Sequence, residues 1–217
     1  TSGSWKDLRQ GKVLKQGAIV RTGGGDSKID LFLDVNGPVV RVTENTQMGI
    51  DNLMFERTGV ETVITTGLDL KEGRILGRVR KMAQASRYEV KTPNGVAGIR
   101  GTKYDISASG LLKVIEGSVL MVWVDALGAV KNYIVNAGQQ FNPNLPGIQP
   151  LDPNVANQIN QQINSIPEGA PIAGEAPVIL PPDLDNIQDQ INRDGQPPTP
   201  YEGRSESSGE NGGDGGD

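Results

Sequence analysis

The stretch TPNGVAGIRGTKYDIS, residues 92–107, decides how the chain is interpreted, because it combines turn formers, a lone arginine and an alternating run. A phosphate-binding loop would need Gly-x-x-x-x-Gly-Lys-Ser/Thr between a strand and a helix. Here the order is Gly101-Thr102-Lys103, no glycine stands five residues before Gly101, and the following residues alternate like a strand. The stretch therefore predicts a turn and a strand, not a phosphate loop.

Alternating runs of the same kind surround this stretch. Ile29, Leu31 and Leu33 share one parity, and an Asn-Gly turn then leads to Val40 and Val42, which is a strong hairpin signal. Further runs, separated by Gly, Asn-Gly or Asp turns, cover residues 61–70, 73–82, 86–92, 102–109, 111–124 and 131–141. Their spacing predicts an all-β body, built as a sandwich, barrel or short solenoid of mainly antiparallel strands.

The composition narrows the chemistry. The chain has no cysteine and no histidine, which removes the usual ligands of zinc, copper and iron and the Ser-His and Cys-His nucleophile pairs. No run approaches the roughly 20 apolar residues that span a bilayer. The chain begins Thr-Ser-Gly-Ser-Trp without an initiator methionine, which is typical of a secreted, extracellular or periplasmic protein whose leader has been removed, or of a trimmed chain.

The charge divides the chain near Phe141. Residues 1–141 carry a net charge of +5 and residues 142–217 a net charge of −10. This asymmetry predicts a basic body with an acidic extension. The expected organisation is a segment at 1–16, a β domain at 17–141 and a Pro/Asn/Gln-rich acidic extension at 142–217.

The extension contains two patterns of helical spacing, at residues 153–166 and 183–193. Each has a narrow apolar stripe and is too short to be stable alone, so each needs a surface to lie on. We expect the stripes to form interaction surfaces, and their members are Val155, Ile159, Ile163, Ile166, Leu184, Ile187 and Ile191. The final Gly-rich acidic residues resemble one copy of a calcium-binding repeat but favour a solvated tail, and whether calcium binds there stays open.

Other chemistry finds weak support. Asp105, Glu116 and Asp125 lie in or beside expected strands, but nothing singles out two of them as a facing pair for glycoside hydrolysis. The basic stretch at 74–91 holds only Tyr88 as a stacking aromatic, which argues against nucleic-acid binding. The sequence therefore predicts no catalytic residue, no metal site and no cofactor.

The segments VKTPNGVAGIRGTKYDIS, LLKVIEGSVLMVW and YIVNAGQQF together resemble FecR-like domains. That family carries Thr-Pro-x-Gly-x-x-x-x-Arg-Gly-Thr-x-Phe/Tyr, then Val-x-Glu-Gly-x-Val and an Ala-Gly-Gln ending, and the resemblance covers about Gly17 to Phe141. It implies a solenoid-like β domain in which the motif residues are architectural, with Arg100 as a buried fork that bonds turn carbonyls. Those residues are Thr92, Pro93, Gly95, Arg100, Gly101, Thr102, Glu116 and Gly117.

Three functions remain open. Family members in iron uptake sit in the periplasm and relay the state of an outer-membrane transporter to a sigma factor, but through a cytoplasmic region and a membrane helix that this sequence does not show. The sequence therefore favours a non-enzymatic secreted protein that self-associates through its extension into an extracellular or envelope assembly, such as a filament. The alternatives are a periplasmic FecR-type sensor or adaptor and a carboxylate enzyme. Expected partners are copies of itself or other envelope proteins, with no nucleic acid.

Overall fold

The structure is a computed structural model that describes residues 5–33, 37–58 and 61–167. Within these ranges the chain forms one sheet of 12 strands and one helix. The strands are β1 (Ile19–Arg21), β2 (Ile29–Phe32), β3 (Val39–Val42), β4 (Gln47–Thr58), β5 (Glu61–Glu72), β6 (Arg74–Arg78), β7 (Arg87–Thr92), β8 (Gly95–Ser107), β9 (Leu112–Val124), β10 (Val130–Asn136), β11 (Gln139–Phe141) and β12 (Ile148–Pro150), and the helix is α1 (Pro153–Asn164). The all-β prediction is confirmed.

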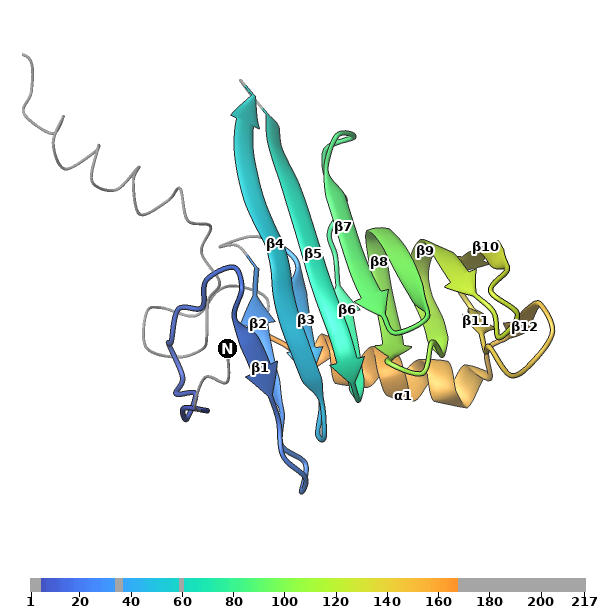
Figure 1. The fold of residues 1–217 in the computed structure, drawn as a ribbon, viewed down its shortest axis with the longest axis horizontal. Coiled ribbons are helices and arrows are strands. Elements are labelled where there is room, and N and C mark those ends of the chain that lie inside the picture. The colour runs from blue at the N-terminus through green and yellow to red at the C-terminus, as the bar shows by residue number, and fades with distance from the viewer. Residues whose placement is uncertain (1–4, 34–36, 59–60, 168–217) are drawn as a thin grey trace, which may run out of the picture.

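The strands lie side by side across the long axis of the molecule, with β1 near one end and β10 to β12 at the other (Figure 1). Their order is β1-β4-β5-β7-β8-β6-β3-β2, while β9 joins β8 to β10 and β11. Neighbouring strands run antiparallel except for β5 and β7, which are parallel. The expected hairpin of β2 and β3 forms, with Leu31 opposite Val40.

Strand β8 changes partner at the Arg-Gly-Thr motif. Its first residues, from Gly95 to Gly98, pair with β7, whereas residues 103–107 pair with β6. The register along β9 is irregular between Arg100 and Lys103, and Gly101 has a φ of 59°. Inward-facing positions are odd before this point and even after it, as a bulge requires. The motif is therefore a corner at which one strand passes from one layer of the sheet to the other.

Strand β9 turns at the same level. It pairs with β11 before Gly117 and with β10 after it. Gly117 has a φ of 79°, and a Cβ added there would lie 2.4 Å from the carbonyl oxygen of Gly101. The two corner glycines thus touch through their backbones, and this contact leaves no space for a side chain on Gly117.

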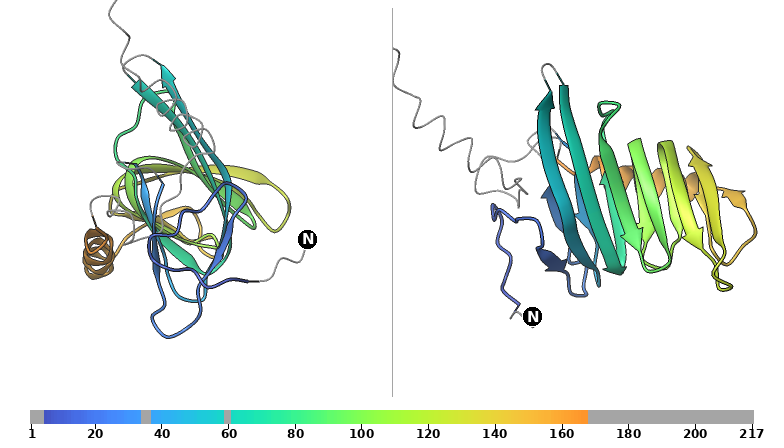
Figure 2. Two further views of the ribbon diagram at one scale, coloured as in Figure 1. Left: turned by 90° about the vertical axis from the view of Figure 1, so that its left-hand side faces the viewer. Right: turned by 45° about the horizontal axis from the view of Figure 1, so that its top comes forward.

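The hydrophobic core lies between the two layers of the curled sheet, which Figure 2 shows end-on in its left view. Tyr88 and Tyr104 are fully buried in it, with their hydroxyls 2.9 Å apart. The Tyr104 ring packs on Gly77, where an added Cβ would come within 2.1 Å of the ring. At the other end Trp123 meets Phe141 in an edge-to-face contact, so both rings pack as core residues.

Helix α1 lies outside the sheet and covers its outer face (Figure 2). Asp152 caps its first turn by accepting from the backbone N–H groups of Asn154 and Val155, and Pro153 occupies the first turn. Buried Ile159 and Ile163 pack on Leu76 of β6. The helix predicted over 153–166 is therefore confirmed, at Pro153–Asn164, whereas the second one, over 183–193, lies outside the described residues.

Candidate functional site

Residues of the Thr-Pro-x-Gly motif form the turn between β7 and β8. The buried Thr92 donates its hydroxyl to the carbonyl of Gly95 at 3.2 Å, and Pro93 lies exposed between them. A Cβ on Gly95 would lie 2.6 Å from the carbonyl oxygen of Val122 on β9. The turn therefore needs a small residue where it approaches β9, which supports an architectural role.

Thr102 braces the corner. Its side chain is buried, with its hydroxyl 2.9 Å from the Arg100 carbonyl and 3.0 Å from the Ser118 carbonyl of β9. The Thr102 carbonyl in turn accepts from the backbone N–H of Val79. One threonine thus joins β9, the β8 corner and the segment after β6. The Thr102 hydroxyl is thus used in bonds to backbone carbonyls, which is a structural role and not that of a phosphate-binding loop.

The expectation that Arg100 is a buried fork is wrong. Arg100 is exposed, and its bond to the Met82 carbonyl is long, at 3.5 Å. The cause is the corner, because Ile99 and Thr102 take the inward positions and leave the arginine side chain outside. Glu116 is likewise 66% exposed at its side chain and forms an ion pair with Lys103 at 3.2 Å.

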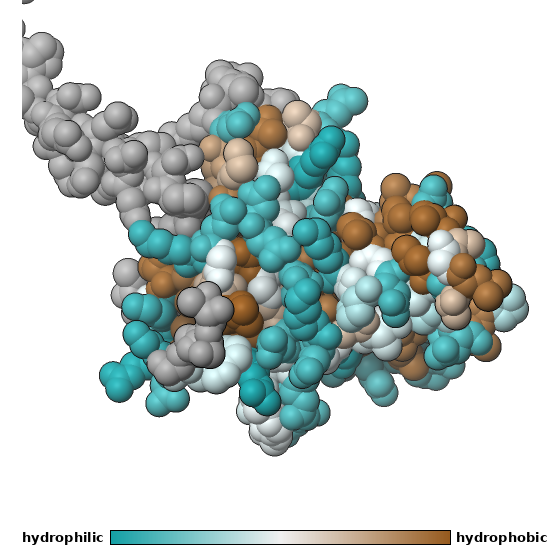
Figure 3. Space-filling view, viewed as in Figure 1, coloured by the Kyte–Doolittle hydropathy of each residue, from teal (hydrophilic) through white to brown (hydrophobic). Residues whose placement is uncertain are grey.

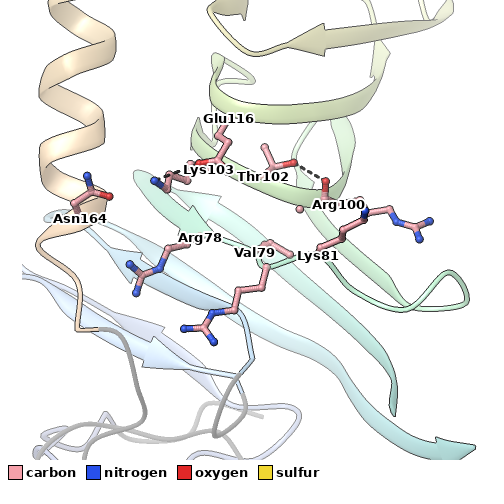
Figure 4. A pocket seen from close by; sticks show the side chains of 10 residues that line it. Arg78, Val79, Lys81, Arg100, Thr102, Lys103, Glu116 and Asn164 are labelled. Atoms are coloured by element: carbon pink, nitrogen blue, oxygen red, sulfur yellow. Dashed lines mark hydrogen bonds and ion pairs between the residues drawn. The ribbon is translucent and has the colours of Figure 1, made fainter. Parts of the chain in front are cut away.

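The exposed arginine borders a basic groove of about 680 Å³ beside the corner. Its floor includes Val79 and Thr102, and Figure 4 shows Asn164 of α1 on one side and Arg100 on the other. We call this pocket the basic groove, and its charged lining residues are Arg78, Arg80, Lys81, Arg100, Lys103 and Glu116. Five cations and one carboxylate give the groove its basic character.

A second set of arginines anchors α1. Arg41 is buried, holds Asp30 with two bonds of 2.6 and 2.7 Å, and donates to the Gln162 carbonyl and the Ser165 hydroxyl. Arg78 donates to the Pro167 carbonyl at 2.9 Å. These cations sit where the helix dipole is negative, although the helix has no basic residue in its own last turn. Sequence spacing gave no signal for this role, since the arginines come from distant strands.

The three candidate carboxylates have separate structural partners. Asp105 is buried and accepts two bonds from Arg74 and one from Lys113. Asp125 accepts from Lys131 and from two backbone N–H groups of its own turn, and the Lys131 bond is the main reason that the pKa of Asp125 lies below its usual value. Since each carboxylate is held by different cations, they do not form the facing pair that glycoside hydrolysis needs.

An apolar surface lies on the outer face of β9 and β10. Leu120 faces Ile134 and Val124 faces Val130 across the strand pair, and all four are exposed, Leu120 by 47% and Ile134 by 65%. Leu127, in the connecting turn, is 94% exposed. We call these five residues the apolar patch, and Figure 3 shows brown residues gathered at this end of the molecule.

The apolar patch borders an open sheet edge. Within the described ranges β10 pairs only with β9, and its seven residues make it the longest edge strand there. An edge strand offers unpaired backbone donors and acceptors to another chain. Contiguous exposed apolar residues at such an edge are typical of protein–protein interaction sites.

The predicted interaction residues of the first stripe face the chain's own sheet. Ile159, Ile163 and Ile166 are buried, and Val155 packs partly buried beside them. Ile166 contacts Phe32 and Val39. Leu184, Ile187 and Ile191 of the second stripe lie outside the described residues. The surface of α1 that a neighbouring copy would use is therefore already covered.

The described part of the chain lacks a metal cluster and a membrane-spanning helix. No cluster of three acidic side chains there could hold a metal ion. The helix in that part is too short and too polar to cross a membrane.

One family model and two solved structures match part of the chain. A family model described as "FecR protein" matches residues 18–120. Two crystal structures from Parabacteroides distasonis ATCC 8503, each described as a "putative anti-sigma factor", share 16% and 14% identity with TM-scores of 0.46 and 0.43. Each match covers 62% of this chain and 60% of the other chain, so the chain spans less than two thirds of their length. No curated protein matched the chain.

Proposed function

Residues 18–120 form a FecR domain, and from that premise we propose that the chain is a non-enzymatic sensor or adaptor module of the periplasm or cell envelope that acts by binding another protein. The family is regulatory, and FecR domains are typically periplasmic. The motif residues lie in the turn and corners of the sheet, which leaves the outer surfaces to carry function.

The apolar patch carries the proposal. Leu120, Val124, Val130 and Ile134 form two facing pairs beside the open edge of β10. The partner that fits is an extended segment of another envelope protein, which adds a strand to β10 and places alternate apolar side chains on the patch. Burying the patch would add hydrophobic stabilisation of about 25 cal/mol for each Å² removed from water.

The surface of α1 that was expected to mediate self-assembly through the extension is buried against the chain's own sheet. The Ile159 and Ile163 side chains pack on Leu76 of the same chain, so they are not offered to a neighbour. Edge-to-edge pairing of two β10 strands is the route to self-association that remains. A crosslinking experiment distinguishes another envelope protein from a second copy of this chain as the partner of β10.

The test places a photo-crosslinking amino acid at Val130 or at Ile134 in the full-length chain, in cells that express the protein naturally. The matched control is Ile19, an exposed apolar residue on the short edge strand β1. Illumination should join the β10 positions to one discrete protein of different mass, while the Ile19 position gives no such product.

A product of twice the mass of this chain would identify β10 as a contact between copies and would support self-association instead. Equal products at all three positions, or none, would contradict a partner at the apolar patch. The double variant Leu120→Lys/Ile134→Lys gives a second check, because both side chains are exposed and the fold should persist. It should abolish the crosslink at Val130.

A further inference from the structure

The basic groove is unusually one-sided in charge. Arg78, Arg80, Lys81, Arg100 and Lys103 line it, and Glu116, the single carboxylate among the lining residues, forms an ion pair with Lys103. Five cationic side chains and one carboxylate thus line one hollow. Like charges this close repel one another, so an anionic occupant would be stabilised there.

The described fold ends beside this groove. Asn164, the last residue of α1, lines it. Arg78, which also lines it, donates to the carbonyls of Ile166 and Pro167 at 3.5 and 2.9 Å. Pro167, the last described residue, therefore lies at the rim of the groove.

That following chain is acidic from its first residue. Residues 168–217, which we call the acidic tail, begin with Glu168 and contain eleven acidic and two basic side chains, a net charge of −9. The 16 residues that follow Pro167, up to Asp183, can span up to about 50 Å when extended, which exceeds what is needed to fold back across a groove at their starting point.

We propose that the acidic tail occupies the basic groove of its own chain. The charges are complementary, and the short connection holds the tail at an effective concentration in the millimolar range, so even weak ion pairs suffice for binding. This docking site lies on β6, β8 and the end of α1, and it is separate from the apolar patch on β9 and β10. The proposal is therefore independent of the partner proposed for β10.

The test measures the distance between two dyes in the full-length chain. The natural chain has no cysteine, so Gln161→Cys on the exposed side of α1 and Gly195→Cys in the acidic tail would be the only labelled positions. A docked tail should hold the dyes close at about 20 mM salt. At about 500 mM salt the Debye length falls to about 4 Å, and the distance should lengthen towards that of a free coil.

Two charge-reversal variants test whether the acidic tail binds at the basic groove. Lys81→Glu/Arg100→Glu changes two exposed cations of the groove, and Lys12→Glu/Arg87→Glu makes the same change of net charge at exposed cations outside it. The groove variant should show the long distance at both salt concentrations, whereas the control variant should behave like the natural chain. Circular dichroism confirms that each variant is folded.

Three results would overturn the proposal. The first is a distance that responds equally to both pairs of substitutions or to neither. The second is a short distance that disappears when the labelled chain is diluted into unlabelled chain, because the tail would then occupy a neighbour's groove. The third is a long distance at low salt together with groove-dependent binding of phosphatidylglycerol vesicles, which would assign the groove to a membrane surface.

Discussion

Replacing Gly117 with alanine tests whether the Arg-Gly-Thr and Glu-Gly segments are architectural. Gly117 has a φ of 79°, and an added Cβ would meet the Gly101 carbonyl oxygen at 2.4 Å and the Thr102 hydroxyl at 2.9 Å. Gly128 is the matched control, because its φ is 80° and nothing lies within 4 Å of an added Cβ. The two substitutions share the backbone penalty and differ in the clash.

The magnitude follows from these two terms. A left-handed conformation costs an alanine about 1–2 kcal/mol, which is the whole loss of unfolding free energy expected for Gly128→Ala. Overpacking at the corner adds about 1–3 kcal/mol, so Gly117→Ala should lose about 2–5 kcal/mol. In a domain of this size each kcal/mol lowers the melting temperature by about 2–4 °C.

Urea unfolding of both variants, followed by far-ultraviolet circular dichroism and by the fluorescence of the buried Trp123, gives the two free energies. Equal losses for Gly117→Ala and Gly128→Ala would refute the reasoning, since the corner contact would then contribute nothing. A larger loss for the Gly128 variant would do so even more strongly.

Further predictions concern buried polar groups. Thr102→Val should lower the free energy of unfolding by about 1–3 kcal/mol, whereas Arg100→Ala should change it by less than about 0.5 kcal/mol, because only the threonine is buried; thermal melts compare them directly. Burial raises the pKa of Tyr88 and of Tyr104 above the usual value of 10.0. The folded state therefore binds these two protons more tightly than the unfolded state does. The stability that results is complete below about pH 10 and is lost as the pH rises beyond it. In an absorbance titration, two tyrosines should form phenolate at a higher pH than an exposed tyrosine would, or only when the chain unfolds. Arg41→Ala should lower the free energy of unfolding by about 3 kcal/mol in urea titrations, because it strands a carboxylate and releases the end of α1; a loss below about 1 kcal/mol would contradict the anchoring role.

Local patterns were sufficient to predict much of the sheet. Alternation placed β2, β3, β5, β7 and β9, and the Asp-Pro start with helical spacing placed α1. Alternation predicted a strand that begins at Thr102, whereas β8 starts at Gly95 and continues through the corner at Gly101. Gly95, which the sequence placed in a turn, is also needed for close approach to β9, which only tertiary contacts reveal.

The candidate surfaces were harder to predict, because they depend on which residues the topology brings together. The basic groove joins cations from β6, β8 and the segment between β6 and β7, and the sequence showed these only as spread charge. The parity shift at the corner could not be read from composition, so Arg100 was expected inside. The role of Arg41 depends on residues more than 120 positions away.

The two layers of the sheet share strands. Strands β8 and β9 each continue from one layer into the other. Unfolding of one layer must therefore also break backbone hydrogen bonds in the other layer. The molecule should accordingly melt in a single cooperative step and not as two half-domains. A force applied to β10 would pass through its hydrogen bonds to β9, and the continuous backbone of β9 would carry it to the part of the sheet that α1 contacts.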